Sequence, residues 1–407
     1  MSNFDKLGNV ANGYGGSGFP EYLQGNINDD IPFIKVSDFN LTENVKYIVK
    51  ANNYVSKELA ENNKFRIFPK NTIVIAKVGA AVYLNRKRIL KQDTIIDNNL
   101  MGIIPKIDVE FLYQSLLHID LTEKVQQGAL PSLTFNLLSD INLFVPDLPT
   151  QKRIAKILST VDGQIEKTEA IIAKYQAIKQ GMLHDLFTRG IDLVTGKLRP
   201  IPEQSPELYK PSPLGLIPKD WNYKTLKDIT LVNQGLQIPI SSRYKDYKEN
   251  RHLYITIQLL NNPMDESYTY YIENPPMSVV CKTQDILMVR TGNTGAVITN
   301  IAGCFHNNFF KISYNSEHTD RDYLVQHLNL QHIQEKIMNY AGTTTIPDLK
   351  HGDFYKLPYL EPEPEEQKYI SAKINKIAML IVSENKVLEK LQKLKQGLVS
   401  KLLNGTV

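Results

Sequence analysis

The side chains with the most obvious chemical potential lie in a short turn, Arg290–Gly295, with the sequence Arg-Thr-Gly-Asn-Thr-Gly. This turn carries a guanidinium, two hydroxyls and an amide, and it contains no nucleophile with a base beside it. A second turn, Lys77–Gly79, precedes a basic triplet at Arg86–Arg88 that could hold phosphate groups. An ordinary tight turn and a solvated loop are the alternative interpretations. Any functional role of these segments is therefore expected to be binding.

No other side chains have the spacing of a catalytic or metal site. His306 and Asp348 lack neighbours at the spacing of a triad or of metal ligands. The two cysteines, Cys281 and Cys304, form no Cys-x-x-Cys pair and are expected to be core residues in a reducing compartment. The glycine-rich stretch Gly13–Gly18 lacks the Gly-Lys-Ser/Thr ending of a phosphate loop, so we expect a flexible loop there.

The composition is that of a globular protein of two or three domains, since the chain has 407 residues and 42% of them are hydrophobic. No apolar run approaches the ~20 residues that a membrane span needs. The segment Met1–Val10 also lacks the pattern of a signal peptide. We therefore expect the protein in the cytoplasm. The two large globular segments are nearly neutral, so any nucleic-acid contacts must rely on local clusters of charge.

Two long segments have the apolar spacing of coiled-coil helices. In Gln151–Thr188 and Gln367–Leu403, apolar residues alternate at spacings of four and three. At ~1.5 Å per residue each helix spans roughly 55 Å, so we expect the two to bury their apolar faces against each other. Polar residues interrupt both seams at matching positions, including Lys179 and Lys395, and would fix the pairing register. The predicted seam residues are Ile154, Leu158, Val161, Ile165, Ile172 and Tyr175 in the first helix and Ile370, Ile374, Ile377, Ile381, Leu388 and Leu391 in the second.

The chain also has an internal repeat. Gln151 and Gln367 match at the same offset as the two helix seams, and the turn at Lys77–Gly79 matches the turn at Arg290–Gly292. The sequence predicts a mixed α/β fold with two pseudo-repeated globular domains, joined by two long antiparallel helices that form a coiled coil. Apolar runs predict strands at Ile31–Val36, Thr72–Val78 and Ile141–Val145 and a helix at Val109–His118. The expected segments are a first domain at 1–149, a spacer helix at 150–189, a proline-rich linker at 190–221, a second domain at 222–361 and a second spacer helix at 362–407.

This arrangement resembles the specificity subunit of type I restriction-modification enzymes. The resemblance rests on Ser212–Trp221 (Ser-Pro-Leu-Gly-Leu-Ile-Pro-Lys-Asp-Trp) ahead of the second domain and on the helix start Leu148–Ile154 (Leu-Pro-Thr-Gln-Lys-Arg-Ile). It covers essentially the full length, in the order domain, helix, domain, helix. The second helix departs from the pattern at Pro364–Gln367, where a leucine would be more usual.

The resemblance implies that each domain is a target recognition domain reading one half of a bipartite, asymmetric site in double-stranded DNA, while the helices set the gap. It implies two methyltransferase (modification) subunits holding S-adenosylmethionine, and restriction/translocase subunits using ATP and Mg. This subunit would itself hold no cofactor or metal and would do no chemistry. Arg and Lys suit guanine, and Asn and Gln suit adenine. The DNA contacts predicted on this basis are Lys77, Tyr83, Arg86, Lys87, Arg88, Arg243, Tyr244, Lys245, Arg290, Thr291, Asn293, Thr294, Thr343 and Thr344.

Two alternative functions rest on other features. A self-contained DNA adenine methyltransferase would explain Asn274–Met277, which approaches an Asn/Asp-Pro-Pro-Tyr/Phe motif. However, the methionine there lacks the aromatic ring that stacks on a flipped base, and no glycine-rich cofactor loop precedes it. A non-catalytic coiled-coil scaffold with two protein-binding domains would explain the nearly neutral globular segments. A methyl-transfer assay on the isolated chain tests the first alternative, and DNA binding at increasing salt tests the second.

Overall fold

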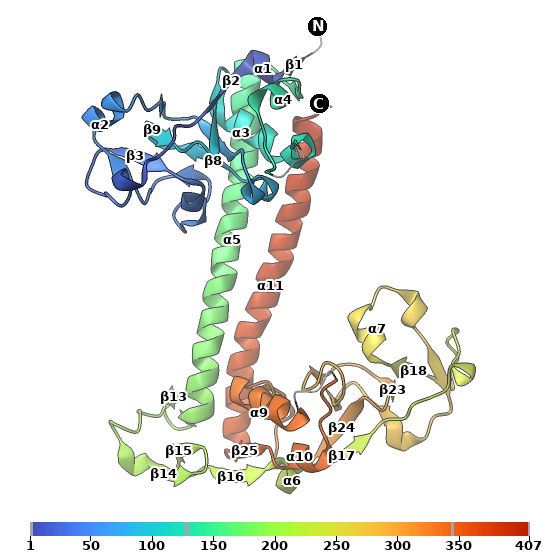
Figure 1. Ribbon diagram of the computed structural model, residues 1–407. Helices are drawn as coiled ribbons and strands as arrows, with labels where there is room; N and C mark the ends of the chain where they lie inside the picture. Colours follow the sequence, from blue (N-terminus) through green and yellow to red (C-terminus); the bar gives the residue numbers. More distant parts are fainter. Residues whose placement is uncertain (1–2, 127–129, 343–345, 406–407) are drawn as a thin grey trace. The chain divides into compact units, whose positions relative to one another are not determined.

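The computed structural model describes residues 3–126, 130–342 and 346–405, and Figure 1 shows the chain as a ribbon. The chain divides into two compact units. Unit 1 comprises Met1–Ile171 and Glu384–Val407, and unit 2 comprises Ile172–Ser383. Each unit therefore contains one globular domain and parts of both long helices.

The domain of unit 1 contains two main sheets and a strand pair. Five strands have the order β2-β10-β7-β8-β4, four have the order β5-β3-β9-β6, and β1 pairs with β11. The central strand β7 is buried along its whole length, which explains its continuous run of apolar residues. The strands are β1 Phe4–Lys6, β2 Ala11–Gly15, β3 Ile31–Ile34, β4 Tyr47–Ile48, β5 Tyr54–Val55, β6 Ile67–Phe68, β7 Ile73–Ala76, β8 Lys87–Leu90, β9 Thr94–Ile96, β10 Leu100–Pro105 and β11 Asn142–Phe144, and the helices are α1 Leu7–Val10, α2 Lys57–Asn62, α3 Val109–Leu117 and α4 Phe135–Ser139.

The domain of unit 2 repeats this topology. One sheet has the order β17-β24-β21-β22, a second has the order β19-β18-β23-β20, and β16 pairs with β25. The strands are β12 Ile191–Asp192, β13 Lys197–Leu198, β14 Tyr209–Ser212, β15 Gly215–Pro218, β16 Asn222–Thr225, β17 Thr230–Gln234, β18 Arg251–Ile255, β19 Tyr271–Glu273, β20 Val280–Cys281, β21 Ile286–Val289, β22 Val297–Ile298, β23 Gly303–Phe305, β24 Phe309–Tyr314 and β25 Pro358–Glu361, and the helices are α6 Leu226–Ile229, α7 Ile257–Asn261, α8 Arg321–Leu328, α9 Gln331–Ala341 and α10 His351–Tyr355. The two long helices are α5 Leu148–Thr188 and α11 Pro364–Leu402.

The predicted mixed α/β fold with repeated domains is confirmed. The strands predicted in the first domain correspond to β3, β7 and β11, and the predicted helix corresponds to α3. Each differs from its prediction by only a few residues at its ends, where sequence patterns are weakest.

Two glutamines at matching positions of the repeat have the same structural role in the two units. The side chain of Gln151 accepts a hydrogen bond from the backbone N–H of Asp108 at 3.0 Å and donates one to the carbonyl of the proline five residues earlier, at 2.7 Å. Gln367 makes the same two bonds, at 2.9 Å to the N–H of Asp320 and at 2.8 Å to its own preceding proline. Asp108 and Asp320 in turn cap α3 and α8. Each glutamine therefore joins the start of a long helix to a helix of its own domain.

The long helices pack antiparallel, as predicted. In unit 1, Leu158 of α5 lies in one hydrophobic cluster with Leu398 near the end of α11. In unit 2, Leu186 near the end of α5 lies in one cluster with Ile370 near the start of α11. The two helices are drawn in green and red in Figure 1. Every predicted seam residue is at least half-buried: Ile154, Leu158, Ile172, Ile370 and Ile374 are buried, and Val161, Ile165, Tyr175, Ile377, Ile381, Leu388 and Leu391 are half-buried.

One polar interruption of the seam is paired in unit 1. The ammonium of Lys395 lies 2.7 Å from a carboxylate oxygen of Asp162, whose other oxygen accepts a hydrogen bond from Gln114 of α3 at 2.6 Å. In unit 2 the matching lysine is Lys179, and the residue matching Asp162 is Ala378. The lysine positions are thus repeated, but the carboxylate is present only in unit 1.

The proline-rich segment at 190–221 folds onto the start of α11 within unit 2. It forms two hairpins, β12-β13 and β14-β15. Glu366 is 1% exposed and accepts hydrogen bonds from Arg199, from the indole N–H of Trp221 at 3.0 Å and from the backbone N–H of Ile191 at 2.6 Å. Gly190 has φ +64°, and a Cβ there would lie 2.2 Å from a Glu366 oxygen, so only glycine fits. The segment is therefore a structured junction held by a buried carboxylate.

Candidate nucleic-acid interface

Each domain presents one turn that is bridged to a proline-containing loop, and we call these the bridged turns. In unit 1 the N–H of Gly79 donates to the carbonyl of Pro131 at 2.9 Å, and the N–H of Leu133 donates to the carbonyl of Lys77 at 2.8 Å. In unit 2 the same two bonds join Gly292 to Pro347 at 3.4 Å and Leu349 to Arg290 at 2.9 Å. Gly79 has φ +74° and Gly292 has φ +100°, a region that favours glycine. The predicted match between the two turns is therefore confirmed by their hydrogen bonds.

The bridged turn of unit 2 holds an ion pair. Arg290 donates to one carboxylate oxygen of Asp348 at 2.7 Å, and the hydroxyl of Thr291 donates to the other. The hydroxyl of Thr294 is buried and bonds the Pro347 carbonyl at 2.8 Å, so it serves the turn itself. Asn293 is exposed, and its side chain bonds no residue of the described ranges. The predicted contacts Thr343 and Thr344 lie outside the described residues.

The bridged turn of unit 1 has a different set of side chains. Ser132 lies where unit 2 has Asp348, since Pro131 and Leu133 correspond to Pro347 and Leu349. The ammonium of Lys77 accordingly forms no ion pair or side-chain hydrogen bond with any residue that the structure describes. Tyr83 is 44% exposed in the short 3-10 turn that follows, at Ala80–Leu84. Unit 1 thus presents a lysine where unit 2 presents an arginine–aspartate ion pair.

The basic triplet after this turn does not act as one cluster. Arg86 bonds the side chain of Asn40, and Arg88 bonds the backbone carbonyl of Asn44 at 2.6 Å. Lys87 departs from the prediction, because it is 1% exposed and its ammonium donates to Asn85 at 2.7 Å and to a backbone carbonyl. Burial lowers the pKa of Lys87 to about 8. A phosphate could not reach Lys87 in this fold, because the alternation along β8 turns its side chain into the domain.

The predicted contacts at 243–245 are packed among tyrosines. Arg243 donates two hydrogen bonds to the Ile238 carbonyl, and the ammonium of Lys245 lies 3.7 Å from the ring centre of Tyr270 while bonding three backbone carbonyls. Arg251 stacks on Tyr244 at 3.6 Å. These cations hold a loop together, and Arg251, which the sequence prediction omitted, belongs to the same cluster.

Two sequence features have structural explanations. Gly13–Gly15 lie in β2, and a Cβ on Gly16 would lie 2.1 Å from the carbonyl oxygen of Asp97. The expectation of a flexible loop was therefore wrong, since these glycines permit close backbone packing. Met277, the last residue of the methyltransferase-like motif, is 70% exposed on the surface.

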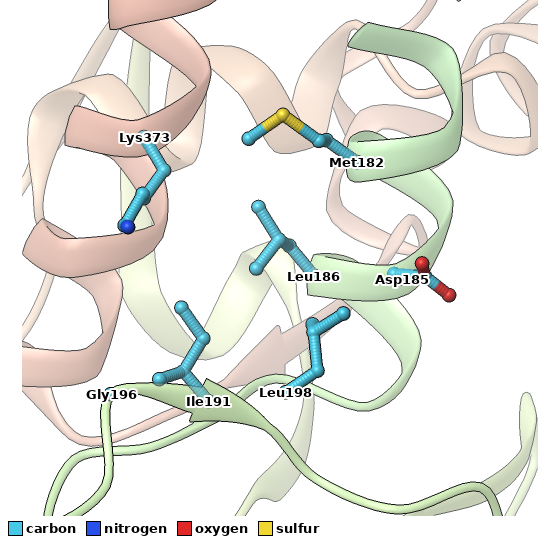
Figure 2. Close-up of a pocket in the computed structure, with 7 residues that line it drawn as sticks. All are labelled: Met182, Asp185, Leu186, Ile191, Gly196, Leu198 and Lys373. Atoms are coloured by element: carbon cyan, nitrogen blue, oxygen red, sulfur yellow. The ribbon is translucent and has the colours of Figure 1, made fainter. Parts of the chain in front are cut away.

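The described residues contain no group of three or more His, Cys, Asp or Glu side chains placed to hold a metal ion. The pocket in Figure 2 lies in unit 2 where the end of α5, the first hairpin and α11 meet, and its lining is mainly apolar, with Met182, Leu186, Ile191 and Leu198 facing one another. None of the helices in the described ranges has the length and apolarity needed to cross a membrane.

The chain is similar to known proteins in both sequence and fold. The family model described as "Type I restriction modification DNA specificity domain" matches twice, at residues 3–176 and 218–393. Among curated relatives from Methanocaldococcus jannaschii, the type I restriction enzyme MjaVIII specificity subunit is 23% identical over 369 residues, covering 86% of this chain and 83% of the relative. The MjaIX specificity subunit is 24% identical over 394 residues, covering 92% and 86%.

A solved structure has the same fold. The S subunit of a type I restriction-modification system from M. genitalium superposes with a TM-score of 0.59 at 14% identity, covering 98% of this chain and 95% of that one. The two family matches each begin in a globular domain and extend into the following long helix, which agrees with the internal repeat.

Proposed function

The chain belongs to the type I restriction modification DNA specificity family, and we propose that each of its two domains reads one half of a bipartite, asymmetric DNA site. As a specificity subunit it is the non-catalytic component of a type I restriction enzyme. The observation that best supports two different half-sites is the pair of bridged turns, which share their backbone hydrogen bonds and differ in charge. The same backbone placed against two half-sites, with different side chains, would select different bases.

We propose that the helix pair sets the gap between the half-sites. At ~1.5 Å per residue, α5 with 41 residues and α11 with 39 residues are each roughly 60 Å long. Continuous helices with buried seams are stiff spacers, which a fixed gap requires. An insertion of four residues, about one helical turn, into α5 would add about 6 Å, equal to one or two base pairs of rise. The gap should then lengthen while the half-sites stay the same, and altered half-sites with an unchanged gap would refute this role.

Apolar residues outside the seam support the docking of two methyltransferase subunits. In unit 1, Ile171, Val387 and Leu394 are exposed on the long helices, and in unit 2 Ile178 and Leu380 are exposed. Ile178 matches Leu394 at the offset of the repeat, and Ile171 matches Val387. Exposed apolar residues repeated on helix surfaces are typical of protein interfaces. One such set in each unit fits two modification subunits, which would bring S-adenosylmethionine, while restriction/translocase subunits would bring ATP and Mg. This subunit would hold no cofactor and would act in the cytoplasm.

The decisive experiment is to express the chain with its matching modification subunit and to sequence the methylated adenines. A single motif of two short words separated by a fixed gap is the expected result. Binding of the purified complex to the cognate duplex should also weaken steeply as salt increases, because phosphate contacts release counterions. Absence of adenine methylation together with salt-independent binding would contradict the proposal.

A further inference from the structure

The carboxylate of Asp348 is held by two donors and is still accessible. Arg290 and Thr291 each bond a different oxygen, and the Asp348 side chain remains 39% exposed. An ionised carboxylate has about four acceptor positions. Two of them are used by the turn, so the others can accept hydrogen bonds from a ligand. The sequence prediction included Arg290 and Thr291 among the reading residues and considered Asp348 only as a candidate catalytic or metal-binding residue, without neighbours at the required spacing.

In this ion pair, the side chain of Arg290 is less exposed to solvent than that of Asp348. The Arg290 side chain is only 16% exposed, and its guanidinium lies 5.5 Å from the ring centre of Phe310. Its position beside Asp348 neutralises the carboxylate, which would otherwise be repelled by DNA phosphates. The bridged turn of unit 2 thus presents a hydrogen-bond acceptor with little net charge.

We infer that Asp348 reads a base in the half-site of the second domain and that Arg290 and Thr291 are positioning residues for its carboxylate. This inference rests on the proposed function. A carboxylate accepts hydrogen bonds and donates none, so its partner must be an exocyclic amino group at a base edge. In the major groove cytosine presents N4 and adenine presents N6, and aspartate pairs most typically with cytosine N4. The expected base is therefore cytosine.

In unit 1, the same turn backbone carries a hydrogen-bond donor in place of the acceptor. Ser132 replaces Asp348, and Lys77 replaces Arg290 without an anionic partner among the described residues. A lysine ammonium donates hydrogen bonds and suits the O6 and N7 acceptors of guanine. The bridged turn of unit 2 would therefore read a base that donates a hydrogen bond, and the bridged turn of unit 1 would read a base that accepts one. Such a difference between the two half-sites is what an asymmetric site needs.

The test uses the full chain in complex with its modification subunit, with methylated-site mapping and competition binding as readouts. Asp348→Ala should lower discrimination at one base pair of one half-site by roughly 5- to 100-fold, leaving the other half and the gap unchanged. Asp348→Asn keeps the size of the side chain and adds an amide donor, so the preference at that position should move from cytosine toward adenine. Ser132→Asp gives Lys77 a carboxylate partner. It should change the base preference at one position of the other half-site.

A matched control is Asp353→Ala, which removes a carboxylate from an ion pair with Lys356 elsewhere in unit 2. It should leave the motif unchanged. An unchanged motif in both Asp348 variants would overturn the inference, as would equal weakening for all duplexes, because a purely structural ion pair affects every sequence alike. If the wild-type complex itself gives no bipartite motif, the proposed function fails, and this outcome is distinct because it precedes any substitution.

Discussion

The two units hold their bridged turns with the same hydrogen bonds, yet the turns differ in charge: unit 1 carries a cation and unit 2 carries an ion pair. Lys77 of unit 1 has no described anionic partner, whereas Arg290 of unit 2 is paired with Asp348. The backbone bonds and the turn glycines are repeated because they determine the shape of the domain. The side chains that face outward differ because the shape does not depend on them, and this freedom would allow each domain to select its own bases.

The starts of the two long helices show a second difference. The matching glutamines make two of their bonds in both units, but Glu366 has Thr150 as its counterpart in unit 1. Glu366 is needed only where a chain segment, 190–221, folds over the helix start. The repeat thus keeps the contacts that both units use, and adds a buried charge where one unit has an extra element.

The largest expected effect comes from Glu366→Ala. This change leaves Arg199 and the indole N–H of Trp221 without their buried acceptor, so unit 2 should lose about 3–5 kcal/mol of stability. Urea unfolding followed by tryptophan fluorescence measures this directly, because Trp221 is the sole tryptophan of the chain. The counterpart Thr150→Ala in unit 1 should cost less than about 0.5 kcal/mol. Equal losses of stability in the two variants would show that the buried carboxylate of Glu366 does not stabilise the junction of unit 2.

Lys87 gives unit 1 a dependence on pH that its counterpart in unit 2, Val297, does not have. Burial lowers the folded-state pKa of Lys87 to about 8, below its ordinary value of 10.5. Between these values the unfolded chain binds the proton and the folded chain does not, so stability should rise with pH, by up to about 3 kcal/mol. In Lys87→Met this rise should be absent. The free energies of unfolding of both proteins near pH 7 and near pH 10 test it, and parallel pH curves would contradict it.

The matching glutamines predict a loss of stability in both units, with the larger loss in unit 2. Gln151→Ala and Gln367→Ala each leave a backbone N–H and a proline carbonyl unpaired, so each should cost about 1–3 kcal/mol. Gln367 also donates to the His318 carbonyl at 2.9 Å and accepts from the Tyr359 hydroxyl at 3.3 Å, so its replacement should cost more than that of Gln151. Exposed glutamines at another matched pair, Gln176 and Gln392, serve as controls and should cost little when changed to alanine. A loss for Gln151→Ala that equals or exceeds the loss for Gln367→Ala would contradict this expectation.

The sequence predicted the features that recur with a period or an offset. The heptad spacing predicted the antiparallel helices, and Gln151 and Gln367 indicated the repeat, because seams and repeated bonds are local patterns. The burial of Lys87 could not be predicted from its basic neighbours, since it depends on which way β8 faces. Asp348 was also missed, because its partner Arg290 lies 58 residues away and meets it only through the folded turn.

The smallest expected effect concerns the seam, where unit 2 has a lysine without the carboxylate that unit 1 provides. Ala378→Asp should recreate beside Lys179 the ion pair that Asp162 makes with Lys395. The side chains of Lys395 and Asp162 are 25% and 19% exposed, and aspartate is a poorer helix former than alanine, so the net gain should be only about 0.5 kcal/mol. A double-mutant cycle with Lys179→Ala separates the energy of the ion pair from the effect of aspartate on helix propensity. Favourable coupling between positions 179 and 378 would show that the two units share one register, and zero coupling would show that the seams pair differently.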